Sequence, residues 1–337
     1  MALQLPHHAG VRLVFGTMTF AGQVDETAAT AQLETFFAFH PEAQYVELDT
    51  AFMYSDTKTE EMLGKILTNE QRQRMRIATK ANPGHKGGLS ALSVNTQITT
   101  SLNNMKADSV DIFYLHWPDP KTPLEQTLKA VQALYKAGKF RELGLSNYHA
   151  TQVSEIYNLC EKHGYVKPTV YQGMYNMLTR AVEPELLPLL RQLNIRFYVY
   201  NPLAGGLLSG KYTSSGDAPI ADTRFDGKSV AGKRYQARYW KDCYFEAIEK
   251  IQKSAAELAP GKTLPEISLT WLHHHSGLKR DAFDAIIVGQ SSASHLHTNL
   301  YSGTQGSEAD NLLPEALLKV IDEAWELVKP ECAPYNR

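Results

Sequence analysis

The sequence predicts a (β/α)8 barrel. Short runs rich in β-branched and aromatic residues recur along the 337 residues, and most begin about 30 residues apart, the length of one strand–helix–strand unit. These runs are almost continuously apolar, which is typical of parallel strands covered on both faces. Helix-like patterns lie between them. An open, doubly wound sheet is the second architecture that this alternation allows.

Eight runs have the composition of strands, which is the number that a closed barrel needs. They span residues 12–18, 45–51, 76–81, 109–117, 140–147, 169–176, 195–202 and 284–290.

The segments between the strands carry helix signals. Asp25 is a plausible N-cap for the first helix, because its carboxylate can accept from a free backbone N–H. Pro123 and Gly138 bracket another pattern, as expected for the start and end of a helix. The predicted helices span residues 26–40, 58–67, 123–138, 183–193, 244–259, 264–275 and 314–328.

One long interval separates the last two strands, at residues 203–283. Its first part, 213–232, is polar and rich in glycine, so we expect a long loop there. In a barrel such an excursion lies over the C-terminal mouth and is more often functional than structural. No second-domain linker is visible, so residues 1–337 are expected to form one domain.

The bulk composition excludes several classes of protein. The formal net charge is −2, which gives no reason to expect a nucleic-acid or anionic-membrane partner. The N-terminal residues do not resemble a signal peptide, and no apolar run reaches the ~18 residues of a membrane span. The three cysteines are far apart and odd in number, so we expect a reducing compartment, the cytoplasm.

Four polar side chains follow the strands at the same end. Asp49 ends the second strand and Tyr54 comes shortly after it, Lys80 ends the third, and His116 ends the fourth. Separately, Asp49 and Lys80 could form a structural ion pair, Tyr54 could face water, and His116 could be a core histidine. Together, at the C-terminal ends of barrel strands, they predict a catalytic site.

This set of groups is suited to the reduction of a carbonyl. A cationic lysine beside a phenol favours the phenolate, so we expect Lys80 to lower the pKa of Tyr54. A carboxylate at Asp49 would keep that lysine charged and in place. A tyrosine tuned in this way can give a proton to a developing alkoxide, and His116 can hydrogen-bond the same oxygen. A separate source of hydride is then required.

The sequence resembles the aldo-keto reductases. The resemblance rests on "LDTAFMYSDTKTEEMLG", "ATK", "YLHWPDP", "GKFRELGLSNY" and "YQGMYNMLTR", and runs from about residue 11 to the C-terminus. It implies the barrel fold and a catalytic tetrad of Asp49, Tyr54, Lys80 and His116. "NPLAGGLLSGKY", "RYQARYWKDCYFEAI" and the terminal "YNR" are most similar to the branch that reduces aflatoxin aldehyde and succinic semialdehyde.

The resemblance implies NADPH, bound in an extended form across the barrel mouth. Ser146, Asn147 and Gln172 would hold the nicotinamide carboxamide, and Tyr200 would stack on its ring. A Lys and an Arg that much of the family carries near the adenosine 2′-phosphate are replaced here by Gly289 and His295. The remaining residues implied in cofactor binding are Asn201, Leu203, Gly205, Gly206, Lys211, Arg224, Gln290, Ser291 and Asn299.

Two other motifs need separate interpretation. Residues 205–211 satisfy G-x-x-x-x-G-K, but Tyr212 follows where a P-loop needs Ser or Thr, so a nucleotide triphosphatase is disfavoured. The consecutive histidines in "LHHH", 272–275, point in different directions on a helix and do not form a ligand set. We expect no metal site.

The branch resemblance also implies substrate contacts from Tyr235, Arg238 and the terminal Arg337. Two arginines at the mouth could hold a carboxylate, which would favour succinic semialdehyde, aromatic aldehydes with a carboxylate, and dicarbonyls. The alternative is that Arg238 pairs with Asp242 on the next helical turn.

The predicted function is NADPH-dependent reduction of aldehydes. The alternative is a regulatory NADPH-binding module, because potassium-channel β subunits resemble the same family; no partner-directed extension favours it. The expected partner is a small aldehyde or ketone. The matched branch is often dimeric, which makes a homodimer compatible with the resemblance.

Overall fold

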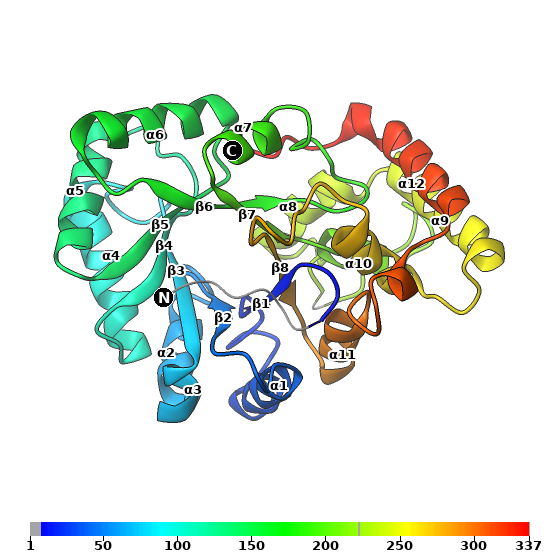
Figure 1. The fold of residues 1–337 in the computed structure, drawn as a ribbon, viewed down its shortest axis with the longest axis horizontal. Coiled ribbons are helices and arrows are strands. Elements are labelled where there is room, and N and C mark those ends of the chain that lie inside the picture. The colour runs from blue at the N-terminus through cyan, green and yellow to red at the C-terminus, as the bar shows by residue number, and fades with distance from the viewer. Residues whose placement is uncertain (1–7, 222, 337) are drawn as a thin grey trace.

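The computed structural model describes residues 8–221 and 223–336, and its strands close into a parallel barrel in sequence order (Figure 1). Strand β1 pairs with both β2 and β8, which closes the ring. The strands are β1 (Arg12–Gly16), β2 (Val46–Asp49), β3 (Met75–Ala81), β4 (Val110–Leu115), β5 (Phe140–Ser146), β6 (Pro168–Met174), β7 (Arg196–Tyr200) and β8 (Ala285–Gly289). Each predicted run overlaps one of them, although β3 and β6 begin one residue earlier than predicted, so the barrel prediction is confirmed.

Helices surround the strands (Figure 1). The predicted helices are present as α1 (Glu26–Phe39), α2 (Lys58–Ile66), α5 (Leu124–Lys136), α7 (Leu186–Gln192), α9 (Asp242–Leu258), α10 (Leu264–His274) and α12 (Glu315–Val328). Asp25 caps α1 by accepting from the backbone N–H of Ala28 at 2.9 Å. Pro123 precedes α5, and Gly138 follows it with φ 69°, as predicted.

Several further helices were not predicted individually. They are α3 (Asn69–Gln73), α4 (Ala91–Met105), α6 (Ala150–His163) and α8 (Val230–Tyr239). Helix α11 (Ala293–Tyr301) follows β8. Helix α8 begins inside the stretch predicted as loop, so that prediction is wrong over its last residues. Ser229 caps α8 by accepting from Gly232 N, and this cap allows a helix to begin in a polar, glycine-rich stretch.

The barrel interior is arranged in layers. Alternate residues of a strand point the same way, so on β3 the inward residues are Arg76 at the bottom, Ala78 in the middle and Lys80 at the top. The middle layer is buried and forms a cluster of Val14, Ala78, Ile112, Tyr114, Val170, Tyr198, Ala285 and Ile287.

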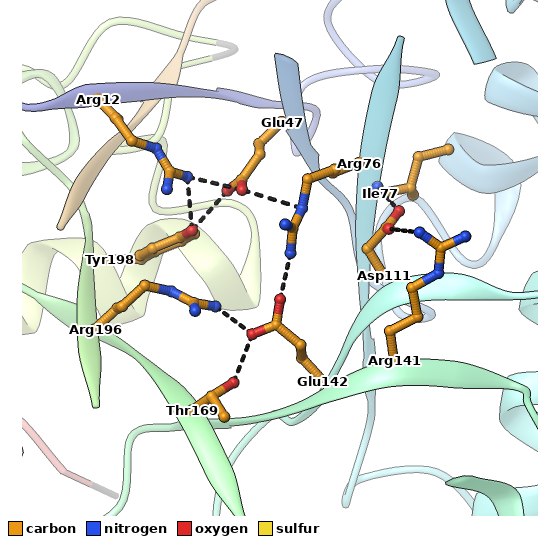
Figure 2. A network of polar contacts seen from close by, with 10 residues as sticks. All are labelled: Arg12, Glu47, Arg76, Ile77, Asp111, Arg141, Glu142, Thr169, Arg196 and Tyr198. Carbon is orange, nitrogen blue, oxygen red and sulfur yellow. Dashed lines mark hydrogen bonds and ion pairs between the residues drawn. The ribbon is translucent and has the colours of Figure 1, made fainter. Parts of the chain in front are cut away.

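Charged residues close the bottom of the barrel (Figure 2). Arg12 Nη2 lies 2.7 Å from Glu47 Oε1 and donates to the hydroxyl of Tyr198 at 2.8 Å. The Tyr198 hydroxyl donates in turn to Glu47 Oε2 at 2.7 Å. Arg12 and Glu47 are both buried, so their charges are compensated by each other rather than by water.

Glu142 joins the other arginines of this bottom layer (Figure 2). It pairs with Arg76, and its Oε2 lies 2.5 Å from Arg196 Nη2 and accepts from Thr169 Oγ1 at 2.7 Å. Arg76 Nε also lies 3.4 Å from Glu47 Oε1, which links the two carboxylates. Five charged residues from five strands therefore form one network.

Within the described ranges, no helix combines the length and the apolar character that crossing a bilayer requires.

Candidate active site

A carboxylate, an amine and a phenol lie together at the C-terminal ends of β2 and β3 and in the loop after β2. Asp49 is the last residue of β2, Lys80 is the penultimate residue of β3, and Tyr54 stands in the loop after β2. Lys80 Nζ lies 2.6 Å from Asp49 Oδ2 and 3.3 Å from Tyr54 OH. It also donates to the carbonyl of Thr50 at 2.7 Å. All three ammonium protons therefore have an acceptor.

His116 stands directly after β4, beside this group. Its ring centroid lies 6.2 Å from that of Tyr54, with the ring planes at 75°. The backbone carbonyl of His116 accepts from Asn147 Nδ2 at 2.9 Å, which ties the end of β4 to the end of β5. The structure thus brings the four predicted residues together at the C-terminal mouth. Their catalytic roles stay predictions.

Burial decides the ionisation of this group. It lowers the pKa of Lys80, and the negative charge of Asp49 opposes that change. Burial, followed by the charge of Asp49, raises the pKa of Tyr54 well above its usual 10.0. Our prediction that Lys80 would lower the pKa of Tyr54 is therefore wrong, because the phenolate would lose solvation and face a carboxylate. Tyr54 keeps its proton at neutral pH.

Polar side chains from the next three strands extend the group. Gln172 Nε2 donates to Asp49 Oδ1 at 2.7 Å, which occupies the second carboxylate oxygen. Asn147 Nδ2 also donates to Ser146 Oγ at 2.9 Å, and Tyr200 OH donates to Asn147 Oδ1 at 2.7 Å. The residues predicted to hold a nicotinamide therefore form two hydrogen-bonded groups, Gln172 with Asp49, and Ser146 with Asn147 and Tyr200.

The chain turns sharply after β7. Gly205 and Gly206 have φ of 71° and 106° inside the short 3-10 helix η1 (Ala204–Ser209), preceded by Leu203. A Cβ at Gly205 would lie 2.5 Å from the ring of Tyr235, so glycine is needed there for space as well as for conformation. Tyr212 is buried, and its hydroxyl shares a hydrogen bond with Thr223 Oγ1 at 3.1 Å. This is not the arrangement of a P-loop.

Arg224 lies between this turn and β8. Its Nη1 donates to the hydroxyl of Tyr235 at 2.9 Å and approaches Asn201 Oδ1 at 3.5 Å. A Cβ at Gly289 would come 3.5 Å from Arg224 Nη2, so the guanidinium faces the position where much of the family carries a lysine. Burial lowers the pKa of His295, and the charge of a second cation, Lys211, lowers it further. Positive groups therefore surround the start of α11.

The helix α8 supplies aromatic and cationic groups above Tyr54. The guanidinium of Arg238 lies 5.9 Å from the ring centroids of both Tyr235 and Tyr239. Burial would raise the pKa of Tyr235, but the charges of Arg224 and Arg238 outweigh it and lower that pKa. Among the ion pairs of the described chain, none joins Arg238 to Asp242, so the alternative surface pair is not formed.

The model of the aldo/keto reductase family matches residues 12–310. The chain belongs to the aldo/keto reductase family. It is 44% identical to human aflatoxin B1 aldehyde reductase member 2 over 345 residues, which covers 100% of this chain and 92% of the relative. It is 43% identical to the mouse protein of that name, covering 96% and 87%, and 41% identical to human aldo-keto reductase family 7 member A3, covering 96% of each. It is an oxidoreductase of the aflatoxin-aldehyde reductase branch.

Aldo/keto reductases generally use a nicotinamide cofactor, and the mouth of this barrel fits one. Both amide atoms of the Gln290 side chain are buried without a hydrogen-bond partner among the described residues. Apart from Gly206 and its two neighbours in the chain, none of the described residues has an atom within 4 Å of the place where a Cβ at Gly206 would stand. Next to Gln290, Ser291 Oγ lies 3.2 Å from His295 Nδ1, and Asn299 Nδ2 donates to the carbonyl of Gly289 at 3.2 Å.

Not all of the predicted site can be placed. Arg337, predicted to bind substrate, lies outside the described residues. Trp117 and Glu60 were not predicted as site residues. The ring of Trp117 lies 4.9 Å from that of His116, and Glu60 is buried and accepts from Thr79, the residue before Lys80. Trp117 could have been found from its position directly after a strand-end histidine.

No cluster of three or more metal-binding side chains is present in the described part of the chain. The first histidine of "LHHH", His273, is buried, and burial lowers its pKa well below 6.5, with His8 and His274 adding to the effect. This placement agrees with the prediction that the histidine run is structural.

Proposed function

We propose that this aldo/keto reductase reduces aldehydes and dicarbonyls to alcohols with NADPH, and that Tyr54 donates the proton. The observation that carries the proposal is the chain of contacts from Asp49 Oδ2 to Lys80 Nζ at 2.6 Å and from Lys80 Nζ to Tyr54 OH at 3.3 Å. The names of the relatives, which are aldehyde reductases, support the same reaction class.

NADPH, when bound, supplies the hydride that reduces the carbonyl carbon. The task of the protein is to protonate the carbonyl oxygen as negative charge develops on it. Tyr54 enters the reaction protonated, because burial raises its pKa. Lys80 hydrogen-bonds the phenol oxygen and stabilises the phenolate that forms when the proton leaves. Asp49 holds Lys80 in the position that this requires.

His116 would orient the carbonyl. Its ring lies edge to face with the ring of Tyr54, with the two centroids 6.2 Å apart. A ring nitrogen of His116 and the hydroxyl of Tyr54 can therefore share the same carbonyl oxygen, which fixes the face of the substrate presented to the hydride.

The cofactor would lie along the strand ends from β5 to β8. Ser146, Asn147 and Gln172 would hold the carboxamide, and Tyr200 would lie against the ring. The backbone from Asn201 to Gly210 would receive the pyrophosphate, because Gly205 and Gly206 carry no side chain that would keep the phosphates away from the main chain. Arg224 and Lys211 would supply the positive charge near the adenosine 2′-phosphate, which supports NADPH over NADH, whereas burial and Lys211 lower the pKa of His295 and favour its neutral form.

The substrate would lie between Tyr54 and α8. The guanidinium of Arg238 lies 5.9 Å from the rings of Tyr235 and Tyr239, and it would hold a carboxylate at the far end of the aldehyde. Succinic semialdehyde has an aldehyde and a carboxylate at its two ends and is therefore the substrate to try first.

The test is NADPH oxidation with succinic semialdehyde and with 4-nitrobenzaldehyde, on wild type and on Tyr54→Phe. We expect turnover by wild type and a fall in kcat of about 10³-fold or more in the variant, because a general acid is removed. Tyr157→Phe is the matched control, since Lys167 Nζ contacts the Tyr157 hydroxyl at 3.4 Å outside the site. NADPH binding without turnover by wild type would favour the regulatory binding module instead.

A further inference from the structure

The loop that carries Tyr54 continues into a strained turn. Ser55, Asp56 and Thr57 have φ of 47°, 54° and 69°, so three successive residues with side chains adopt the left-handed conformation. This conformation is unfavourable for L-residues and especially for a β-branched one such as Thr57. Such strain persists only where the surroundings over-determine the backbone, and it is concentrated at functional sites.

One anchor of the turn is the carbonyl of Phe20, in the loop after β1. It accepts from Ser55 Oγ at 2.9 Å and from Thr59 Oγ1 at 2.9 Å, so both of its lone pairs are used. Phe20 is itself fixed, because its side chain is buried with its ring 5.7 Å from that of Phe15. Thr59 is fully buried, so water does not compete for its hydrogen bond.

The second anchor joins the turn to the strand of Lys80. Glu60 is fully buried, and its Oε1 accepts from the hydroxyl of Thr79 at 2.5 Å. Thr79 directly precedes Lys80 in β3. Burial raises the pKa of Glu60, although the hydroxyls of Thr79 and Ser101 and the charge of Lys80 oppose it. The hydrogen bond to Thr79 therefore ties the first turn of α2 to the residue before Lys80.

We propose that Thr59 and Glu60 are positioning residues for Tyr54, holding its loop against β1 and against β3 so that the phenol stays within reach of Lys80. This inference rests on the proposed function, because it concerns the geometry of the proton donor. Tyr54 OH and Lys80 Nζ are 3.3 Å apart, at the long end of hydrogen-bond distances. A displacement of about 1 Å would break that contact, and misplacements of this size reduce rates about 10²-fold.

The inference predicts a specific pattern in two pairs of variants. Thr59→Val removes the hydroxyl at nearly constant volume, whereas Thr59→Ser retains it. Glu60→Ala removes the acceptor for Thr79, whereas Glu60→Gln retains a carbonyl oxygen that can accept from the same hydroxyl. We expect kcat to fall about 10- to 100-fold in Thr59→Val and Glu60→Ala and to stay within about threefold of wild type in Thr59→Ser and Glu60→Gln. The Kd for NADPH, measured by quenching of protein fluorescence, should stay unchanged in all four.

Thr57→Gly tests whether backbone strain, rather than the two anchoring hydrogen bonds, places the phenol of Tyr54. Glycine adopts the left-handed conformation freely, and the change leaves Thr59 and Glu60 in place. We expect a melting temperature equal to or about 1–2 °C above that of wild type, with kcat unchanged. A loss of kcat in Thr57→Gly as large as that in Thr59→Val would overturn the proposal, because strain rather than the anchors would then place the phenol.

The result of Tyr54→Phe distinguishes the proposed function from the positioning role of Thr59 and Glu60. If that variant reduces aldehydes as fast as wild type, the proposed function is wrong at its proton donor. If it is inactive while Thr59→Val and Glu60→Ala retain the kcat of wild type, the proposed function stands and the positioning role is wrong. Should Glu60→Ala fail to fold, the Thr59 pair decides the question alone, since Thr59→Val changes neither charge nor volume appreciably.

Discussion

Replacing Glu142 with glutamine tests the charged network at the bottom of the barrel. Glu142 pairs with Arg76 and with Arg196, and the substitution leaves both guanidinium groups in place with a neutral partner of the same shape. Removing one member of a buried charge cluster is costly because the remaining charges stay desolvated. The change should therefore destabilise the fold without touching the C-terminal mouth.

The magnitude follows from the ionisation of the carboxyl group. Burial alone would raise the pKa of Glu142, but Arg196, Thr169 and Arg76 outweigh it and lower the pKa from 4.5 to about 2. At about 1.4 kcal/mol per pKa unit, that gap corresponds to about 3 kcal/mol of stability at pH 7. The side chain is 20% exposed, and solvent screening reduces the expected loss to about 2–3 kcal/mol.

The sign of the pH dependence is fixed by the direction of that pKa. Because the folded pKa lies below the unfolded one, the contribution is complete above about pH 4.5 and is lost as the pH falls toward 2. Urea unfolding of wild type and Glu142→Gln at pH 7, 5, 4 and 3 should show a constant difference down to pH 5. By about pH 3 the difference should have fallen by more than half.

Glu161→Gln is the matched control. Glu161 Oε1 lies 2.6 Å from Lys167 Nζ, but its side chain is 62% exposed, so this surface pair should contribute about 0.5 kcal/mol or less. A difference between wild type and Glu142→Gln below about 1 kcal/mol at pH 7, or one that stays constant to pH 3, would refute the reasoning.

Three further predictions concern the mouth, the middle layer and the buried histidine. Arg238→Ala should raise KM for succinic semialdehyde at least tenfold more than for 4-nitrobenzaldehyde in steady-state assays; equal effects would exclude a carboxylate contact. Gly144→Ala would place a Cβ 2.3 Å from Tyr114 Cδ1 and should destabilise the fold by about 1–3 kcal/mol in urea titrations, with partial recovery when Tyr114→Leu is added. Because burial lowers the folded pKa of His273, wild type should lose up to about 1.4 kcal/mol per pH unit below 6.5 relative to His273→Asn; parallel stability curves would contradict this.

The strands and the place of the site could be predicted because their signals are local. A β-branched run that ends in a polar residue indicates both a strand and the side chain that it places at the barrel mouth, as in "RIATKA" with Lys80. Helix α4 gave a weaker signal, because serine, threonine and asparagine dilute its apolar stripe. Helix α8 begins within a glycine-rich stretch that is typical of loops.

What could not be predicted depends on tertiary structure. The pKa of Tyr54 is raised by burial, and no neighbour in sequence shows how deeply the phenol lies. The pairing of Arg12 with Tyr198 joins residues 186 positions apart, so it requires the barrel to close. The left-handed turn after Tyr54 contains no glycine and therefore carries none of the usual sequence signal for that conformation.

The buried middle layer limits the routes by which a proton can reach Tyr54. No member of that buried cluster is more than 7% exposed, and it lies between the bottom charges and Lys80. Water below the barrel therefore has no hydrated path to the phenol through these residues. Aldehyde, alcohol and the replacement proton must all use the same entrance, so we expect Tyr54 to be reprotonated only as the alcohol leaves.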